Sequence, residues 1–442
     1  MNAPSPKQNA FQTALARLFE RFDSAILSGS WISILIACTG YGLDYLLNLT
    51  LAQWLAPADL GDYSVAVSMA VFGGMVALLG TDQALMQFLP QYISEKDWKR
   101  AKGILVFCFA AVLIASLLIS VLTLLISQFG MKDWAGHPAV FAFAALPVVS
   151  MALLTAKALR GFRYIVIASA PTSIGVPVLI MSAGYVLSKD GYISDWDLVG
   201  VFGLSFMLVL ILQSSVLVRK VMQTVKAIGT TIEYKEWSTA SFSMMMTSVL
   251  FLAMEQMGLY ICEMMAGEED VAIYAVLVKH ARFLLIIYLA VNLITIPFIS
   301  PALKRNDQNE LQRLYGTSMH IVLWGGLLPL LVFIFQGDAL LKAFGPEYEK
   351  GYSSLLILMG AYYLNFIAGF SVPFLQYSGN RQIVITSISI ALSIEILLFI
   401  LLVPAYGFNG AAWSMAVTLS SLSLWMTFQC HRRLGLKPLR LS

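Results

Sequence analysis

Long apolar stretches separated by short polar segments follow one another along almost the whole chain. Each is long enough for a helix that crosses roughly 30 Å of hydrocarbon, which takes about 20 residues. We place these stretches at 31–54, 60–81, 103–128, 139–158, 165–187, 197–218, 239–262, 271–298, 317–336, 352–376, 383–403 and 408–428. The pattern predicts an all-α membrane protein with twelve transmembrane helices.

The segment before the first stretch, residues 1–30, is too polar to contain the hydrophobic region of a signal peptide. Apolar side chains recur in it at helical spacing, with charged side chains on the opposite face: Phe11, Leu15, Leu18, Phe19, Phe22 and Ile26 against Arg17, Glu20, Arg21 and Asp23. Such a helix lies on a membrane surface, so we expect a cytoplasmic amphipathic segment over 1–30. A disordered tail is the alternative.

Composition supports the membrane assignment. Apolar residues make up 59% of the chain and charged residues 12%, about half of the ~25% that is typical of soluble proteins. So few charges cannot cover a water-facing surface. The net charge of +3 is too small to indicate binding to nucleic acid. The four cysteines are scattered and form no CxxC pair, which argues against a metal site or a disulfide framework.

Lysine and arginine are distributed unevenly between the two sides of the predicted helices. The side that bears the N-terminus holds 22 of them, the opposite side holds 4, and 2 lie inside a span. Because positive charge is retained in the cytoplasm, both termini are expected there. Residues 429–442 then form a cytoplasmic basic tail.

The loops are short, and they carry no recognisable catalytic motif. GxxxxGK[ST] and HExxH are both absent, so neither ATP hydrolysis nor zinc peptidase chemistry is predicted, and we expect no cofactor. We do not expect an enzyme. A membrane-embedded polysaccharide-assembly enzyme or scaffold remains the alternative from another functional class.

The two halves of the chain resemble each other at an offset of 211 residues. DLGDYSVAVSMAVF (59–72) aligns without gaps with DVAIYAVLVKHARF (270–283), including Asp59 with Asp270 and Tyr63 with Tyr274. The offset covers six spans, an even number, so both halves have the same topology and form parallel repeats, as in several secondary transporters. We therefore expect two six-helix lobes, 31–218 and 239–428, joined by a cytoplasmic linker at 219–238.

Several charged residues lie inside predicted spans, where each costs roughly 2.5–3.5 kcal/mol on insertion scales. The acidic ones are Asp44, Glu255 and Glu395. Lys279 and Arg282 are three residues apart and share a helical face, and the hairpin of spans 7 and 8 puts Glu255 at a similar depth. The group is either an ion pair that locks two helices together or a cationic patch on a central cavity. Glu395 lies on a span that is peripheral by sequence order, and its role is either functional or purely structural.

Further polar residues have equally plain structural explanations. Lys157, Arg160 and Arg163 recur every three residues at the cytoplasmic end of span 4. They either anchor the helix at the membrane surface or gather phosphate at a cytoplasmic mouth. His280 points away from Lys279 and Arg282, and we expect it to be packed or hydrogen-bonded rather than a ligand.

Three segments carry a resemblance to a known family. They are LAQWLAPADLGDYSVAVSMAVFGGMVALLGTDQALMQFLPQY (51–92), GPEYEKGYSSLLILMGAYYLNFIAGFSVPFLQYSGNRQ (345–382) and VPAYGFNGAAWSMAVT (403–418). They resemble the bacterial polysaccharide, or O-antigen, flippases of the multidrug/oligosaccharidyl-lipid/polysaccharide exporter superfamily. The lipid II flippases of that superfamily carry two helices more than the twelve predicted here, which makes lipid II a less expected cargo.

The resemblance implies a V-shaped pair of bundles that works by alternating access. It implies export of an undecaprenyl-diphosphate-linked oligosaccharide, with membrane lipids and other polysaccharide-assembly proteins as further partners. On this hypothesis Lys279, Arg282, Lys157 and Arg160 bind substrate, while Asp44, Glu255 and Glu395 serve coupling or gating, with Na⁺ or H⁺ as a candidate coupling ion. The rival is an ion-coupled multidrug/cation antiporter of the same superfamily, which favours an anionic cavity.

Overall fold

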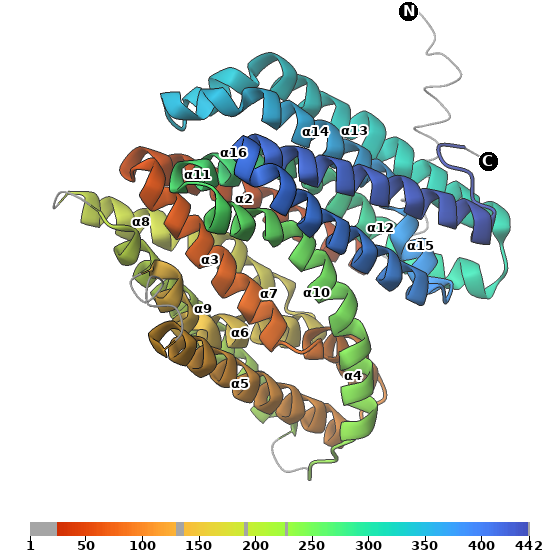
Figure 1. Cartoon of the computed structure of the whole chain (residues 1–442). Coiled ribbons are helices and arrows are strands. Elements are labelled where there is room, and N and C mark those ends of the chain that lie inside the picture. The colour runs from red at the N-terminus through yellow and green to blue at the C-terminus, as the bar shows by residue number, and fades with distance from the viewer. Residues whose placement is uncertain (1–23, 130–136, 190–192, 226–228, 441–442) are drawn as a thin grey trace, which may run out of the picture.

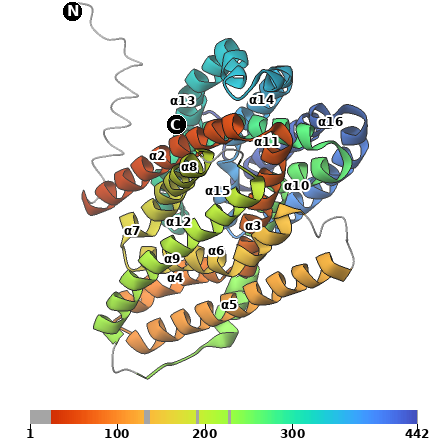
Figure 2. The same ribbon diagram turned by 90° about the vertical axis from the view of Figure 1, so that its left-hand side faces the viewer.

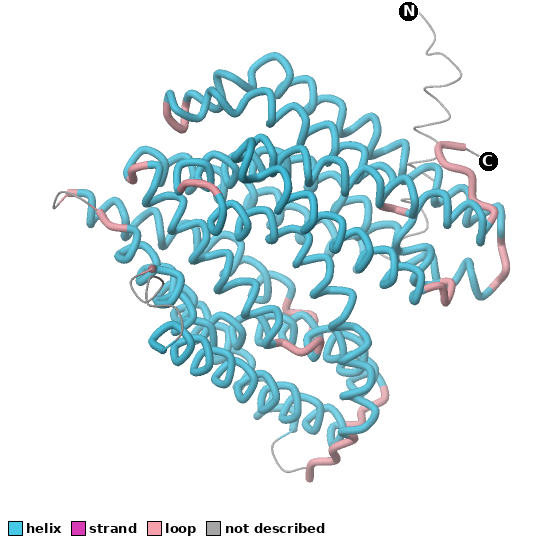
Figure 3. Tube along the Cα trace, viewed as in Figure 1, coloured by secondary structure: helices cyan, strands magenta, loops and turns pink. Residues whose placement is uncertain are grey.

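The computed structural model describes residues 24–129, 137–189, 193–225 and 229–440, so most of the predicted amphipathic segment over 1–30 lies outside it. Within these residues every regular element is a helix and none is a strand (Figure 3). The predicted all-α class is confirmed.

The N-terminal lobe is built around α6 (Pro138–Gly161), which contacts three long helices: α3 (Pro57–Ala77), α5 (Trp98–Phe129) and α9 (Asp195–Val225). Its other elements are α2 (Ser24–Trp54), α4 (Thr81–Ser94), α7 (Ile165–Ala170), the π-helical turn η2 (Pro171–Gly175) and α8 (Val176–Ser188). Helix α2 packs against α7, η2 and α8, on the side of this lobe that Figure 2 brings forward.

The C-terminal lobe contains α10 (Tyr234–Met265), α11 (Glu268–Ala281), the 3-10 turn η3 (Arg282–Leu284), α12 (Leu285–Lys304), α13 (Gln308–Lys342), η4 (Pro346–Gly351), α14 (Tyr352–Ala368), α15 (Ser371–Tyr377) and α16 (Arg381–Leu434). Helix α16 is two helices joined at Gly407, whose φ of 54° and ψ of −135° are not helical. A left-handed φ favours glycine, which has no Cβ to clash with the backbone. The two halves of α16 lie side by side, since Trp425 Nε1 donates to Ser387 Oγ at 2.9 Å.

The helices agree with the predicted spans. Eleven helices, or runs of helices, among the described residues are long and apolar enough to cross a membrane. Since α16 folds back on itself, they account for the twelve predicted crossings. The ends differ in places: the span predicted at 271–298 is interrupted at η3, and α9 and α10 extend into the predicted linker at 219–238.

The predicted repeat is visible in the helix ends. Helices α2 and α10 end at Trp54 and Met265, and α3 and α11 begin at Pro57 and Glu268. Each pair is separated by the same 211 residues as the sequence repeat. The α2–α3 and α10–α11 hairpins are therefore equivalent elements of the two lobes.

The lobes meet along α3, α10 and α11, and α2 also contacts α12 (Figure 1). The α2–α3 and α10–α11 turns lie at one end of the molecule, which we call the α2–α3 end; the α4–α5 and α12–α13 turns lie at the opposite one, the α4–α5 end. At the α2–α3 end the helices approach closely, because a Cβ built on Gly61 would stand 2.7 Å from the carbonyl oxygen of Glu268. Glycine is required there by the neighbouring backbone.

Helix α10 is attached to both lobes. Near its start, Trp237 is fully buried and its Nε1 donates to Tyr92 Oη on α4 at 3.1 Å. Just before it, Glu233 forms an ion pair of 2.8 Å with Arg100 on α5. Beyond these contacts α10 packs against α16 in the C-terminal lobe.

Candidate functional site

A cavity of about 640 Å³ opens between the lobes toward the α4–α5 end. Its lining comes from α4 of the N-terminal lobe and from α10, α12, α14, α15 and the first residue of α16 in the C-terminal lobe. Many of the lining side chains are polar or aromatic: Gln83, Ser248, Glu255, Tyr288, Asn292, Asn365, Gln376, Tyr377 and Arg381. Such a lining can receive a polar solute between the two lobes.

Arg282 and Glu255 form an ion pair beside this cavity, with 3.1 Å between Nη2 and Oε2. Arg282 is the first residue of η3, where the helix tightens after α11. Its guanidinium also hydrogen-bonds the side chain of Tyr362 on α14. Both partners of the ion pair belong to the C-terminal lobe, and Glu255 keeps 43% of its side chain exposed.

Lys279 makes a second ion pair, which joins the two lobes. Its Nζ lies 3.7 Å from Asp44 Oδ2 and donates to Asn48 Oδ1 at 2.5 Å, and both partners are on α2. Asp44 also borders a smaller cavity of about 280 Å³ between α2, η2 and α8. The Lys279 contact is thus a bridge between α11 of one lobe and α2 of the other.

The structure therefore brings Asp44, Glu255, Lys279 and Arg282 into two ion pairs. The two carboxylates balance the two cations, so the sign of this site alone does not choose between an anionic and a cationic cargo. An incoming anion competes with the carboxylates for the cations, and an incoming cation competes with the cations for the carboxylates. In either case the incoming ion replaces one partner of an ion pair that is already present.

The expectation that His280 is packed agrees with its surroundings. Its ring is fully buried. Nδ1 lies 2.7 Å from the carbonyl oxygen of Val276, and Nε2 lies 3.3 Å from Tyr45 Oη. Phe344 packs edge-on against it. Since Tyr45 is on α2, this cluster also joins the two lobes.

The other predicted site residues lie elsewhere. Lys157 pairs with Asp82 at 3.5 Å, and Arg160 donates to Ser169 Oγ at 2.7 Å, which ties α6 to α7. Neither cation borders the cavity between the lobes or the smaller one at Asp44. Glu395 is fully buried within the C-terminal lobe, and neither of its carboxyl oxygens has a hydrogen-bond partner among the described residues. A buried polar group without a partner is costly.

A further charged cluster, which sequence reasoning missed, closes the seam between the lobes at the α2–α3 end. His137 Nε2 lies 3.5 Å from Asp62 Oδ1 on α3 and 3.2 Å from Glu263 Oε1 on α10. The ligand atoms of the three side chains lie within 4.8 Å of one another, so the cluster can hold a metal ion. No spacing in the sequence links these residues, which explains why the cluster was not predicted.

Three effects act on the protonation of His137, which precedes the first turn of α6. Its Nδ1 accepts the backbone N–H of Ala139 at 3.0 Å, and this capping bond favours the neutral ring. Burial also lowers the pKa of His137, but the hydrogen bonds and charges of Asp62 and Glu263 raise it further, to about 9. The carboxylates dominate: on protonation the ring gives up the acceptor at Nδ1, because both nitrogens then carry hydrogen, and it joins the lobes through Glu263.

Comparisons with known proteins identify the fold. No protein-family model matches the chain, and no curated protein matches it. An inward-facing multidrug resistance MATE family transporter of the MOP superfamily is similar in structure, with a TM-score of 0.72, 14% identity, and coverage of 91% of this chain and 98% of that chain. An outward-facing MATE family transporter is similar too, with a TM-score of 0.68, 14% identity, and coverage of 94% of this chain and 97% of that chain.

A third similar structure is a MOP superfamily transporter from Pyrococcus furiosus, for which a reversed polarity of the binding pocket suggests a different function. Its TM-score is 0.68 at 14% identity, with 92% of this chain and 95% of that chain covered. Likeness at this level of identity establishes architecture. The chain has the two-bundle fold of the MATE transporters of the MOP superfamily.

Proposed function

We propose that this protein is an alternating-access transporter that moves the head group of a lipid-linked oligosaccharide across the bacterial inner membrane, from the cytoplasmic to the outer leaflet. The cavity at the α4–α5 end is the cytoplasmic entrance, as the distribution of Lys and Arg predicts. The seam at His137 and Gly61 closes the opposite side. This arrangement corresponds to an inward-facing state.

The observation that carries the proposal is that two interior cations, Lys279 and Arg282, pair with carboxylates that line the cavities: Asp44 in the smaller cavity and Glu255 in the cavity between the lobes. A diphosphate-linked glycan cannot cross hydrocarbon unaided, because its charges and hydroxyls would lose their hydration. Cationic side chains make strong, charge-assisted hydrogen bonds to phosphate. Arg381, which borders the same cavity, adds a third cation nearer the entrance.

The two ion pairs suggest how cargo drives the conformational change. A diphosphate that binds Lys279 displaces Asp44, and this breaks the bridge between α11 and α2. Cargo then has a higher affinity for the state in which that bridge is open, and such a difference in affinity is what a ligand-driven switch requires. Asp44, Glu255 or Glu395 is the place for a coupling Na⁺ or H⁺. Lys157 and Arg160, which lie away from the cavity, have anchoring or packing roles in this scheme.

A second candidate function is ion-coupled multidrug or cation export. The comparisons favour it, because the similar solved structures include multidrug resistance transporters. Asp44 and Glu255 would then receive the cation.

Transport in proteoliposomes separates the two candidates. The protein is assayed once with a fluorescent lipid-linked oligosaccharide and once with a cationic dye under a Na⁺ or H⁺ gradient. The flippase proposal expects flipping that Arg282→Ala abolishes. Arg305→Ala is the matched control, because Arg305 pairs with Glu310 on an exposed surface away from the cavity. Dye efflux without flipping of the lipid would assign the protein to the antiporters.

A further inference from the structure

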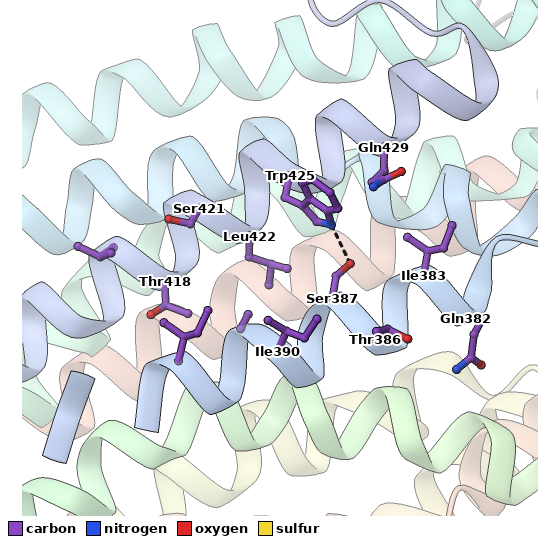
Figure 4. Close-up of a pocket in the computed structure, with 13 residues that line it drawn as sticks. Gln382, Ile383, Thr386, Ser387, Ile390, Thr418, Ser421, Leu422, Trp425 and Gln429 are labelled. Atoms are coloured by element: carbon purple, nitrogen blue, oxygen red, sulfur yellow. Dashed lines mark hydrogen bonds between the residues drawn. The ribbon is translucent and has the colours of Figure 1, made fainter. Parts of the chain in front are cut away.

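A groove of about 530 Å³ runs between the two halves of α16, apart from the cavity between the lobes (Figure 4). Ile383, Ile390 and Ile394 line it from the first half, and Val417 and Leu422 line it from the second. These side chains present an almost entirely apolar surface. A hydrocarbon chain is the ligand that such a surface favours.

The groove has the depth of one membrane leaflet. It begins beside Gln382 and Gln429 at the α4–α5 end and extends to Ile394 and Val417. At 1.5 Å per residue, the stretch from Gln382 to Ile394 is about 18 Å long, a little more than half of the roughly 30 Å hydrocarbon core. A single acyl chain that enters from the α4–α5 end fits this length.

The groove is polar at its entrance. Gln429 keeps only 6% of its surface exposed, and its Oε1 has no hydrogen-bond partner among the described residues. One turn further in, Trp425 donates to Ser387, at the level where tryptophan usually marks the membrane interface. A buried amide oxygen without a partner calls for a hydrogen-bond donor from a ligand.

The same end of α16 carries positive charge, since its last turn contains His431, Arg432 and Arg433. Arg433 donates to Asn380 Oδ1 at 3.1 Å, which holds it near the start of the same helix. The entrance thus combines Gln429 Oε1, which lacks a hydrogen-bond donor, with the arginines Arg432 and Arg433, which attract an anion. A phospholipid head group with an ammonium and a phosphate offers both.

We propose that this groove binds one phospholipid with a primary ammonium head group, of the phosphatidylethanolamine class, from the leaflet at the α4–α5 end. One acyl chain lies between the halves of α16, the ammonium donates to Gln429 Oε1, and the phosphate lies at the level of Arg432 and Arg433. Phosphatidylcholine has the same chains and phosphate but no N–H donor, so it leaves the acceptor of Gln429 unsatisfied. The site is independent of the cargo that the transporter carries.

Native mass spectrometry of the full-length, purified protein tests this site. The protein is stripped of lipid and then incubated with phosphatidylethanolamine or phosphatidylcholine of identical acyl chains. We expect one phosphatidylethanolamine per protein, with about tenfold preference over phosphatidylcholine, the scale of one hydrogen bond to a charged group. Gln429→Met should abolish the preference and keep some binding of both lipids, because the apolar groove remains.

Two tryptophan variants provide the matched comparison. Ile390 borders the groove and Leu397 lies outside it on the same half of α16, and they are 56% and 55% exposed. Ile390→Trp should fill the groove and remove the bound lipid, whereas Leu397→Trp should retain it. Equal retention of the two lipids by the wild-type protein would overturn the proposal, as would retention by Ile390→Trp. Preferential binding of a polyisoprenyl phosphate would also overturn it and would assign the groove to the tail of a cargo.

Discussion

Raising the pH through about 9 should loosen the contact between the lobes at the α2–α3 end. His137 carries an extra proton when this seam is closed, because Asp62 and Glu263 raise its pKa. When the seam opens, the ring loses Glu263 and its pKa returns toward the ordinary value. Protonation therefore stabilises the closed seam; this contribution is fully present below pH 6.5 and disappears as the pH rises through about 9.

The size of the effect follows from the same pKa. A rise from 6.5 to about 9 corresponds to about 3 kcal/mol, at about 1.4 kcal/mol for each pH unit. The side chains of His137, Asp62 and Glu263 are 14%, 19% and 9% exposed, so solvent screens their interaction little. Since Asp62 is in the same lobe as His137, only part of this free energy opposes opening. We expect the equilibrium constant for closing the seam to fall about tenfold.

Electron spin resonance distances across the seam measure this directly. Spin labels at Trp196→Cys on α9 and Met264→Cys on α10 report on the two lobes, in a background where the exposed Cys38 is replaced by serine. The wild-type ring should give a shift toward longer distances between pH 7.5 and 9.5. His137→Gln keeps a hydrogen-bonding side chain without the titration and should remove the shift. A shift of equal size in His137→Gln would refute the reasoning, and sensitivity to a chelator would indicate a metal in the cluster.

Three further predictions concern the contacts between and within the lobes. Glu255→Gln removes the carboxylate that neutralises Arg282, so cargo should bind more tightly and leave more slowly in single-turnover flipping assays. The side chains of Lys279 and Asp44 are 38% and 48% exposed, so the double variant Lys279→Met/Asp44→Asn should change the free energy of unfolding by no more than about 1 kcal/mol. The same variant should stop transport of a lipid-linked oligosaccharide. Full transport by it would exclude Lys279 from the site. Gly61→Val should push α3 away from α11 and shift the spin-label distances at the α2–α3 end toward the open state at every pH.

Much of the architecture could be predicted from the sequence, because apolar length and the 211-residue repeat depend on local pattern. The interruption at η3 could not, since the apolar residues on both sides of Arg282 extend far enough to predict one uninterrupted span over 271–298. The sequence did indicate that Lys279, Arg282 and Glu255 lie at similar depth.

The partners of these charges depend on how each helix is rotated and on how the lobes approach each other. For that reason the bridge from Lys279 to Asp44 and Asn48 was not predicted. Arg160 was expected either to anchor the end of a span or to gather phosphate, and the resemblance assigns it to substrate binding; in the structure helix α7 folds back to place Ser169 beside its guanidinium. Hydropathy contains no information about such a contact.

The double attachment of α10 determines where the molecule has to deform when one lobe moves against the other. Trp237 fixes the start of the helix to the N-terminal lobe, while most of its length travels with the C-terminal lobe, so rocking of one lobe against the other must bend α10 between the two attachments. Residues 238–248 of that stretch contain only Ser, Thr, Met, Ala and Phe and no charge. Ser238 and Thr239 donate to the carbonyl oxygens of Tyr234 and Lys235, a pattern that weakens and bends helices. The compliance of this stretch, about three helical turns, sets how far the entrance at the α4–α5 end can widen before the lobes separate.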